Sequence, residues 1–571
     1  MYSRAEIIDR ARWLTHQRVS LWLLIVCASL FILIGHGNID VIDRDEARFA
    51  QASKQMVETA DIITVRFQDE LRAKKPIGIY WLQAASAAFF GEEDISSYRI
   101  PSLLGYILSL IFCYQFVKSL WPDSGHLQQL IPTSLLASCF IILAEAHIAK
   151  TDSILLGLIM IQQYSLWLFY KNRDNINNSS GRSWFWVSMA LAILIKGPIA
   201  PLLALIMLAG LTLIERDWRW LKQLRFLLGL LIIAVICLPW VVAVSIATDG
   251  RFLAEAISID LLPKITSGQE SHGAPPGTYL LTILLLIFPV SLLIGAVGRT
   301  GAQFWRSDAS KFCLIWLVGY WFIIELIPTK LPHYILPMLP ALMLLIGRAV
   351  FLPVSSIKWR RITEIAIYVF ASLCGAFLVA SSLWGAAKLG AENGGYAFGF
   401  VLIMLVLFIA ICWFGYKWLK DKNSHINARG QFALVIAIFG IMFNCIFFSG
   451  VIGNLKSVHI ATMIETELEK FPIKTKIIAL AGYHEPSAVF TLGRDILLVS
   501  EDEAALLLAE APDAVIIVEA KKLEQFQLGI QKLGISAYQL SKVTGFNISK
   551  GQFVELHFFS SIKFDDKDLN G

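Results

Sequence analysis

Long apolar segments recur between residues 20 and 451 and constrain this chain more than any other feature of its sequence. A membrane-spanning helix needs about 20 predominantly apolar residues. Only 16% of the residues are charged, whereas soluble globular proteins have about 25%. We therefore expect a polytopic α-helical membrane protein with about 13 transmembrane helices. The candidate spans are 20–36, 100–120, 130–148, 153–170, 184–196, 198–214, 226–246, 278–297, 312–327, 334–351, 362–385, 397–417 and 431–451.

Basic residues between these segments predict the orientation. Lys and Arg are enriched in cytoplasmic loops, and with the N-terminus inside, five of the six predicted cytoplasmic loops contain them; 121–129 is the exception. An odd number of spans then places the C-terminal part outside the cytoplasm. We interpret Ser20–Ile34 as a retained first span, not as a cleaved signal peptide. The net charge of +5 is modest, so no nucleic-acid partner is expected.

Residues 76–91 form a further apolar run, but sixteen residues are short for a span. Counting this run as a span would disturb the agreement between loop charge and orientation. We interpret it as a helix in the outer membrane interface, with Tyr80 and Trp81 at the level of the lipid headgroups.

The character of the sequence changes near residue 457. Short apolar runs alternate there with helical patterns, which predicts a small α/β domain with a partly parallel sheet. We therefore divide the chain into a transmembrane domain, 1–456, with a large first outer loop at 37–99, and a soluble extracytoplasmic domain, 457–571. The predicted strands are 477–480, 496–499, 514–518 and 553–559, and the predicted helices are 502–510 and 521–533.

Ionisable residues concentrate at the predicted outer ends of the spans and in the first outer loop. Charged side chains at membrane level are costly, so they indicate function by default. Their confinement to one side predicts a one-sided active site better than a pathway across the membrane. Besides the first outer loop, these positions are Glu145, His147, Lys150, Asp152, Lys196, Lys264, Glu270, His272, Lys330, His333 and Tyr334.

An ordered series of short motifs resembles the membrane glycosyltransferases that use polyprenyl-phosphate sugars, the group with the GT-C fold. That group includes the protein O-mannosyltransferases and the lipid A aminoarabinose transferases. The motifs are Asp45-Glu46-Ala47-Arg48-Phe49-Ala50, Lys75-Pro76 followed by Tyr80-Trp81, Arg99-Ile100-Pro101-Ser102, Thr151-Asp152, Lys196-Gly197-Pro198, Leu238-Pro239-Trp240, His272 before Pro275-Pro276, and the stretch from Lys330 to Pro337.

The resemblance implies roles for individual residues. Asp45 corresponds to the expected catalytic base, and Glu46 and Asp152 join it as catalytic carboxylates. The residues implied in binding the donor phosphate or the substrates are Arg48, Lys75, Lys196, His272, Lys330 and Tyr334. Two positions depart from the aminoarabinose transferases, because Lys74 stands where they tend to have Glu and Lys264 where we would look for Arg.

These residue types suit transfer of a sugar from a phosphate carrier. The sugar passes through an oxocarbenium-like state while negative charge grows on the departing phosphate, which Lys and Arg stabilise. A positioned Asp accepts the proton of the attacking hydroxyl. We expect an inverting glycosyltransferase in a bacterial inner membrane, with its active site facing the periplasm. The expected partners are a polyprenyl-monophosphate sugar and a lipid A, lipopolysaccharide, other glycan or protein acceptor. No cofactor or metal is required, although the carboxylates would suit a divalent ion.

Other interpretations of these residues remain open at the level of sequence. Asp45 and Asp152 also suit helix N-termini, where carboxylates bind free N–H groups, and Lys196 suits the end of a span. A transporter or flippase is expected to have charges at mid-membrane and internal repeats, and we find neither. The break at Gly197-Pro198 is the one feature that favours transport. A non-catalytic assembly or sensor protein is a further alternative.

Overall fold

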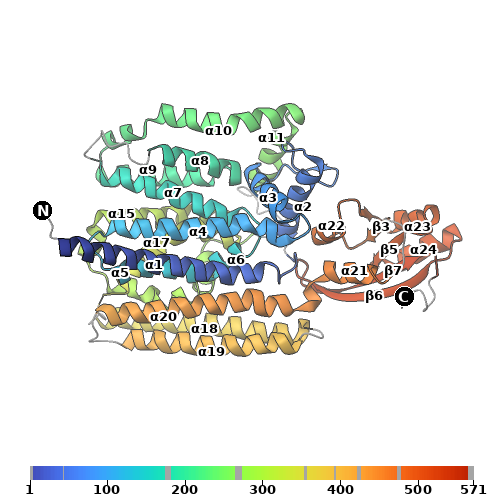
Figure 1. Cartoon of the computed structure of the whole chain (residues 1–571). Helices are drawn as coiled ribbons and strands as arrows, with labels where there is room; N and C mark the ends of the chain where they lie inside the picture. Colours follow the sequence, from blue (N-terminus) through green and yellow to red (C-terminus); the bar gives the residue numbers. More distant parts are fainter. Residues whose placement is uncertain are drawn as a thin grey trace.

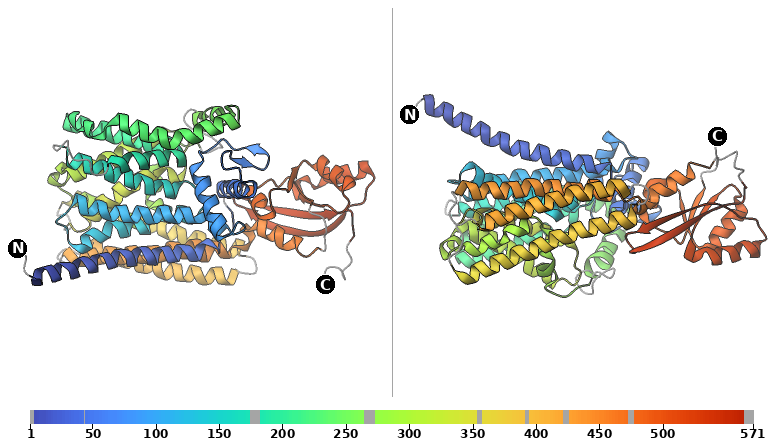
Figure 2. Two further views of the ribbon diagram at one scale, coloured as in Figure 1. Left: turned by 45° about the horizontal axis from the view of Figure 1, so that its top comes forward. Right: turned by 90° about the horizontal axis from the view of Figure 1, so that it is seen from below.

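A bundle of long helices makes up most of the molecule, and a small domain with a β-sheet lies at one end of it (Figure 1). The computed structural model describes residues 4–42, 44–173, 182–263, 273–352, 357–390, 394–420, 426–471 and 477–563. The views in Figure 2 show that the long helices run roughly along one direction and that the C-terminal domain extends beyond one end of the bundle. We call this end the site end.

The helices of the bundle follow the apolar segments of the sequence. The first half of the bundle contains α1 (Arg4–His36), α4 (Ile95–Leu120), α5 (His126–Ser138), α6 (Phe140–Ala146), α7 (Asp152–Lys171), α8 (Arg182–Lys196), α9 (Ile199–Glu215), η1 (Arg219–Leu224) and α10 (Phe226–Ala247). After α11 (Arg251–Glu255) and η2 (Ala256–Leu261), the second half contains α13 (Thr278–Leu286), η3 (Val290–Arg299), α14 (Ala302–Arg306), α15 (Asp308–Leu314), η4 (Ile315–Gly319), α16 (Tyr320–Leu326), η5 (Pro332–Met338), α17 (Leu339–Ala349), α18 (Lys358–Leu389), α19 (Gly394–Lys420), α20 (Ile426–Cys445), η7 (Ile446–Val451), η8 (Ile452–Asn454) and η9 (Lys456–Val458).

Each predicted span overlaps helical structure, but thirteen crossings are not confirmed. Among the described residues, eight helices are long and apolar enough to cross a membrane, or up to ten if each of two bent pairs counts as one span. The axes of α5 and α6 differ by 63°, and those of α13 and η3 by 116°. Pro289 lies at the second break, where its missing N–H cannot continue the helical ladder. Helices α8, α9 and α17 are shorter than 18 residues, so the predicted spans 184–196, 198–214 and 334–351 are not among these ten. The count of thirteen stays a prediction.

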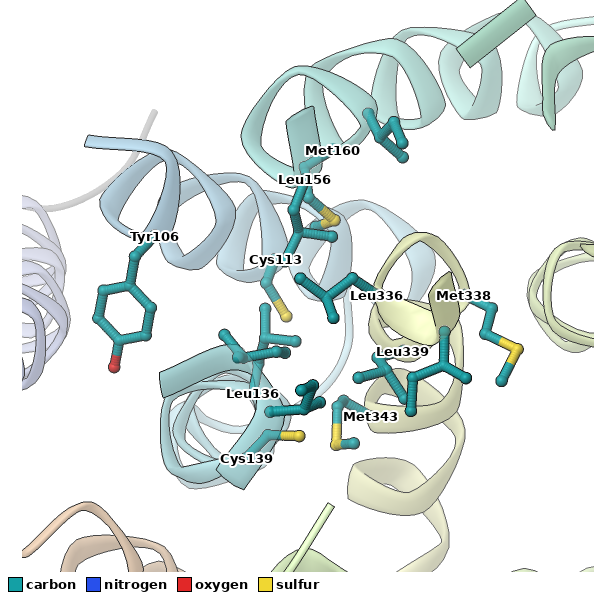
Figure 3. Packing of buried hydrophobic residues seen from close by; sticks show 14 of the residues in the cluster. Tyr106, Cys113, Leu136, Cys139, Leu156, Met160, Leu336, Met338, Leu339 and Met343 are labelled. Atoms are coloured by element: carbon teal, nitrogen blue, oxygen red, sulfur yellow. The ribbon is translucent and has the colours of Figure 1, made fainter. Parts of the chain in front are cut away.

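The core of the bundle lies between α4, α5, α7 and α17 (Figure 3). Cys113 of α4, Leu136 of α5, Leu156 of α7 and Leu339 of α17 are all buried there. The close approach of α4 and α7 depends on Gly105, because a Cβ added to it would lie 2.2 Å from the Ser153 carbonyl oxygen. Small residues commonly permit such helix contacts in membranes. This contact fixes the start of α7 relative to α4.

Four short elements cover the site end of the bundle (Figure 1). They are α2 (Arg44–Thr59), β1 (Arg66–Phe67), β2 (Glu70–Leu71) and α3 (Gly78–Phe90), and they form most of the predicted first outer loop. Helix α2 is amphipathic and buries Ala47, Ala50 and Met56. Helix α3 packs against α2 and α4. The prediction that 76–91 lies in the membrane interface stays a prediction.

The C-terminal domain contains a five-stranded sheet with the order β4-β3-β5-β7-β6. Strand β3 is parallel to β4 and β5, and β7 is antiparallel to β5 and β6, which agrees with the expected partly parallel sheet. Strand β6 was not predicted, because its outward residues are polar and its apolar signal is weak. The elements are α21 (Ile460–Leu468), β3 (Ile478–Ala481), α22 (Pro486–Leu492), β4 (Leu497–Val499), α23 (Glu501–Glu510), β5 (Val515–Glu519), η10 (Ala520–Lys522), α24 (Leu523–Leu533), β6 (Tyr538–Asn547) and β7 (Gln552–Ser560). The exact division at 456/457 stays a prediction.

Candidate active site

Asp45 lies in the first turn of α2, at the site end of the bundle. Its side chain is 53% exposed, and one carboxylate oxygen lies 3.4 Å from the Arg48 guanidinium. Desolvation raises the pKa of Asp45, but the nearby cations Lys150, Arg72, Arg48 and Lys75 outweigh it and hold this pKa below its ordinary value. Asp45 is therefore an accessible carboxylate that stays ionised among positive charges.

A second carboxylate, Asp152, is the first residue of α7 and is largely buried. The Lys196 ammonium, from the last turn of α8, lies 2.5 Å from an Asp152 oxygen. The same ammonium lies 5.9 Å from the centre of the Tyr334 ring of η5. Lys150 interacts electrostatically with both Asp45 and Asp152. Four segments thus bring Asp45, Asp152, Lys196 and Tyr334 into one charged cluster.

His333 also belongs to this cluster. Its Nδ1 atom lies 3.8 Å from a Glu145 oxygen, and its ring interacts electrostatically with Asp152, Asp45 and Lys196. His333 thus links the Glu145 carboxylate to the charged cluster.

Glu46 takes part in a buried ion pair and not in the exposed cluster. The Arg99 guanidinium donates to both Glu46 oxygens, at 2.8 and 2.9 Å, and both side chains are about 1% exposed. The backbone N–H of Ala149 also donates to Glu46. These bonds fix the start of α2 to α4 and to the segment that precedes α7. These bonds suit a positioning role for Glu46, and the catalytic role that we predicted for it stays a prediction.

Lys330 caps the C-terminal end of α16. Its ammonium donates to the carbonyl oxygens of Ile324 at 3.0 Å, Glu325 at 2.9 Å and Ile327. A cation at this position also suits the negative end of the helix dipole. All three N–H groups of the ammonium are therefore hydrogen-bonded in this conformation. Lys330 could bind a phosphate only if one or more of these hydrogen bonds to carbonyl oxygens were broken.

The structure adds Arg72 and Lys150 to the predicted site residues. The Nε atom of Arg72 donates to the Tyr80 hydroxyl at 3.2 Å, and its guanidinium lies 5.2 Å from the centre of the Phe49 ring. Lys150 precedes the Thr151-Asp152 motif by one residue. The charge of each residue was visible in the sequence, but only the folding of the first loop onto α7 brings both beside Asp45. His272 lies outside the described residues.

A cavity of about 380 Å³ opens beside this cluster, between the first outer loop, the segment around η2 and the C-terminal domain. Arg48 and Arg72 line it, and both also act on Asp45. The remaining lining residues are Phe67, Glu70, Leu71, Ala73, Lys74, Glu255, Ile259, His484 and Pro486. No group of three or more His, Cys, Asp or Glu side chains suited to a metal ion occurs in the described part of the chain. The metal requirement stays a prediction.

The sequence is similar to those of membrane sugar transferases. A family described as dolichyl-phosphate-mannose-protein mannosyltransferase matches residues 74–242. An undecaprenyl phosphate-alpha-4-amino-4-deoxy-L-arabinose arabinosyl transferase of Pseudomonas fluorescens is 28% identical over 341 residues, which are 58% of this chain and 59% of the relative. A Pseudomonas aeruginosa protein of the same description is 27% identical over 327 residues, 57% of this chain. The chain thus matches 59% of the length of these curated relatives.

Solved structures match almost the whole chain. ArnT from Cupriavidus metallidurans in the apo state has a TM-score of 0.73 at 16% identity, covering 95% of this chain and 98% of that one. The same protein bound to undecaprenyl phosphate has a TM-score of 0.72, covering 96% and 98%. At this identity the likeness shows the fold. The protein therefore has a GT-C fold like that of ArnT, and the fold class predicted from the sequence is confirmed. The sequence matches agree with the resemblance predicted from the ordered motifs.

Proposed function

We propose that this protein is a glycosyltransferase that moves a sugar from a polyprenyl monophosphate to an acceptor outside the cytoplasm. The observation that carries the proposal is the position of Asp45, an accessible carboxylate held among cations beside a cavity at one end of a GT-C bundle. The descriptions of the relatives support a sugar donor of this class.

Asp45 would act as the general base. The acceptor hydroxyl attacks the anomeric carbon from the face opposite the phosphate, and its proton passes to the Asp45 carboxylate. The bond between the anomeric carbon and the phosphate oxygen breaks, and the polyprenyl phosphate departs with both bonding electrons. The configuration at the anomeric carbon is inverted. A carboxylate with a lowered pKa is ionised and ready for this step at neutral pH.

Cations around Asp45 would stabilise the departing phosphate. Arg48, Arg72, Lys75 and Lys150 supply positive charge where negative charge develops, and prepositioned charge of this kind is a major source of rate enhancement. Lys196 is already paired with Asp152. We propose that this pair contacts the sugar or the phosphate and that Tyr334 flanks it.

The acceptor that we favour is lipid A or another lipopolysaccharide glycan.

We place the site on the periplasmic side of a bacterial inner membrane, because basic loops lie at the opposite end of the bundle. A protein acceptor is a second candidate, favoured by the match of residues 74–242 to a family described as protein mannosyltransferases.

Mass spectrometry of envelope glycans in a deletion strain tests this proposal. We expect one sugar mass to disappear from lipid A or core glycans and to return with the wild-type gene but not with Asp45→Asn. The control Asp123→Asn alters an exposed aspartate in the loop between α4 and α5, at the other end of the bundle, and should restore the mass. A change confined to glycoproteins would select the protein acceptor. An unchanged profile of both classes would contradict the proposal.

A further inference from the structure

The C-terminal domain supplies one wall of the cavity beside Asp45. His484 and Pro486, which lie at the start of α22, face residues of the first outer loop across this space. The other walls come from the loop residues Arg72 and Lys74 and from Glu255. The cavity of about 380 Å³ is therefore completed only when the domain is docked on the bundle.

Several hydrogen bonds fix the domain in this position. The Arg44 guanidinium donates to both oxygens of Glu485, the residue next to His484, at 3.0 and 2.7 Å. The Asn547 amide donates to the same carboxylate at 2.9 Å. On the other side, the Gln68 amide donates to the carbonyl oxygens of Arg494 and Ile496. The wall carrying His484 is thus held at a defined place relative to α2.

The hydrogen bonds of His484 determine which ring nitrogen carries the proton. Its Nε2 atom lies 3.1 Å from the Leu480 carbonyl oxygen and 3.2 Å from that of Val499. Carbonyl oxygens only accept hydrogen bonds, so Nε2 carries the proton. In the neutral ring Nδ1 is then an acceptor for a hydroxyl, and in the protonated ring it donates to an anion.

The charges on the other walls favour a ligand with both anionic groups and hydroxyls. Arg48, Arg72 and Lys74 are cationic, and Arg side chains suit phosphate groups because their fork of N–H donors matches the phosphate oxygens. Glu70 and Glu255 supply acceptors for sugar hydroxyls. Phe67 and Pro486 add apolar surface on which a sugar ring can pack.

Arg48 and Arg72 connect this cavity to the base. Both line the cavity, and both act on the Asp45 carboxylate, with Arg48 only 3.4 Å away. A saccharide held here would present its hydroxyls or phosphate oxygens next to Asp45, which is where an acceptor has to lie.

We propose that this cavity binds the phosphorylated saccharide headgroup of the acceptor and that His484 of the C-terminal domain takes part in selecting it. This inference rests on the proposed transferase function and assigns the acceptor side of it. The ligand chemistry is a phosphosugar, carried either on a lipid or free in solution.

Binding to the full-length protein in nanodiscs tests the inference without any turnover. The probes are lipid A, dephosphorylated lipid A, free glucosamine 6-phosphate and undecaprenyl phosphate. We expect His484→Ala and Lys74→Ala each to weaken binding of lipid A about five- to tenfold, which corresponds to one or two lost polar contacts. Binding of undecaprenyl phosphate should not change. The control Lys532→Ala alters an exposed lysine in α24, at the far side of the domain, and should bind lipid A like the wild type.

The further probes separate the two sources of ligand. Competition by free glucosamine 6-phosphate would assign recognition to the headgroup alone, whereas competition by lipid A only would assign it to a lipid-borne headgroup. The inference is overturned if lipid A and its dephosphorylated form bind equally, or if both cavity variants retain wild-type affinity. If the deletion leaves the envelope glycans unchanged while lipid A binding still depends on His484, the transferase function is refuted and the binding site stands.

Discussion

The Arg44 guanidinium forms two hydrogen bonds with the Glu485 carboxylate and thereby joins helix α2 to a domain 441 residues further along the chain. Arg44 precedes Asp45 directly, so the contact that docks the C-terminal domain lies next to the proposed base. Because the same carboxylate also accepts from Asn547, its loss would leave two donors without their partner. Docking of the domain and the geometry of the site are therefore linked.

Glu485→Gln should loosen the domain. Hydrogen bonds to charged groups contribute about 1.5–3 kcal/mol, and we expect the lower end because the Arg44 side chain is 38% exposed. Limited proteolysis should cleave between the bundle and the domain several times faster, and KM for the acceptor should rise more than KM for the donor. Glu524→Gln, at an exposed position of α24, should behave like the wild type. Equal proteolysis rates for both variants would contradict the docking role.

Glu46→Ala and Asp45→Asn change adjacent residues but should differ in their effect on the Tm. Breaking the buried Glu46–Arg99 pair leaves an uncompensated charge and costs about 3–5 kcal/mol, so Glu46→Ala should lower the Tm of the purified protein. Asp45→Asn should keep the wild-type Tm because Asp45 is exposed. Thermal unfolding in detergent decides this, and a Tm for Glu46→Ala equal to that of the wild type would refute the positioning role.

Asp152 and Lys196 should act as a unit. Their charged atoms lie 2.5 Å apart, and both side chains are largely buried. Each single change, Asp152→Asn or Lys196→Met, should lower kcat/KM strongly, and the double variant should lose much less than the product of the two single losses. Steady-state transfer rates of the four proteins measure this coupling. Strictly multiplicative losses would show that the pair is not coupled in the reaction.

The pH dependence should follow the charges around Asp45. Because its pKa lies below the ordinary value of 3.8, the base stays ionised at neutral pH, and activity is lost only as the pH falls through that lowered pKa. Arg72→Gln removes one of the cations, so the pKa of Asp45 should rise and the acid limb of the kcat/KM profile should move to higher pH. Arg66→Gln, also in the first outer loop, should leave the limb unchanged. An unshifted limb in Arg72→Gln would contradict this electrostatic account.

The sequence was informative where one physical signal dominates. Apolar length located the helical segments, and alternation of short strands and helices located the sheet of the C-terminal domain. The ordered motifs predicted the GT-C fold. The bends at α5–α6 and α13–η3 were not predicted, because apolar length does not report the direction of a helix axis, and the number of crossings stays a prediction. Strand β6 was missed because only three of its ten residues are buried, which leaves a weak apolar signal.

Most predicted site residues converge, but their individual roles required the fold. Asp45, Arg48, Lys75, Asp152, Lys196 and Tyr334 all lie at the site end, as expected from charges placed at the outer ends of spans. The motif could not show that Asp45 is exposed whereas Glu46 is buried against Arg99, because this difference depends on which face of α2 each residue occupies. Arg72 and Lys150 were not assigned to the site, because their approach to Asp45 depends on contacts between segments that the sequence separates by 27 and 105 residues.

The most direct test of the central claim is transfer by purified protein in nanodiscs from a polyprenyl monophosphate that carries a radiolabelled sugar. We predict that wild-type protein labels lipid A with inversion at the anomeric carbon, and that Asp45→Asn binds the carrier normally but transfers about 100- to 10,000-fold more slowly. Wild-type transfer rates in Asp45→Asn, or a product that retains the anomeric configuration of the donor, would contradict the assignment of Asp45 as the base.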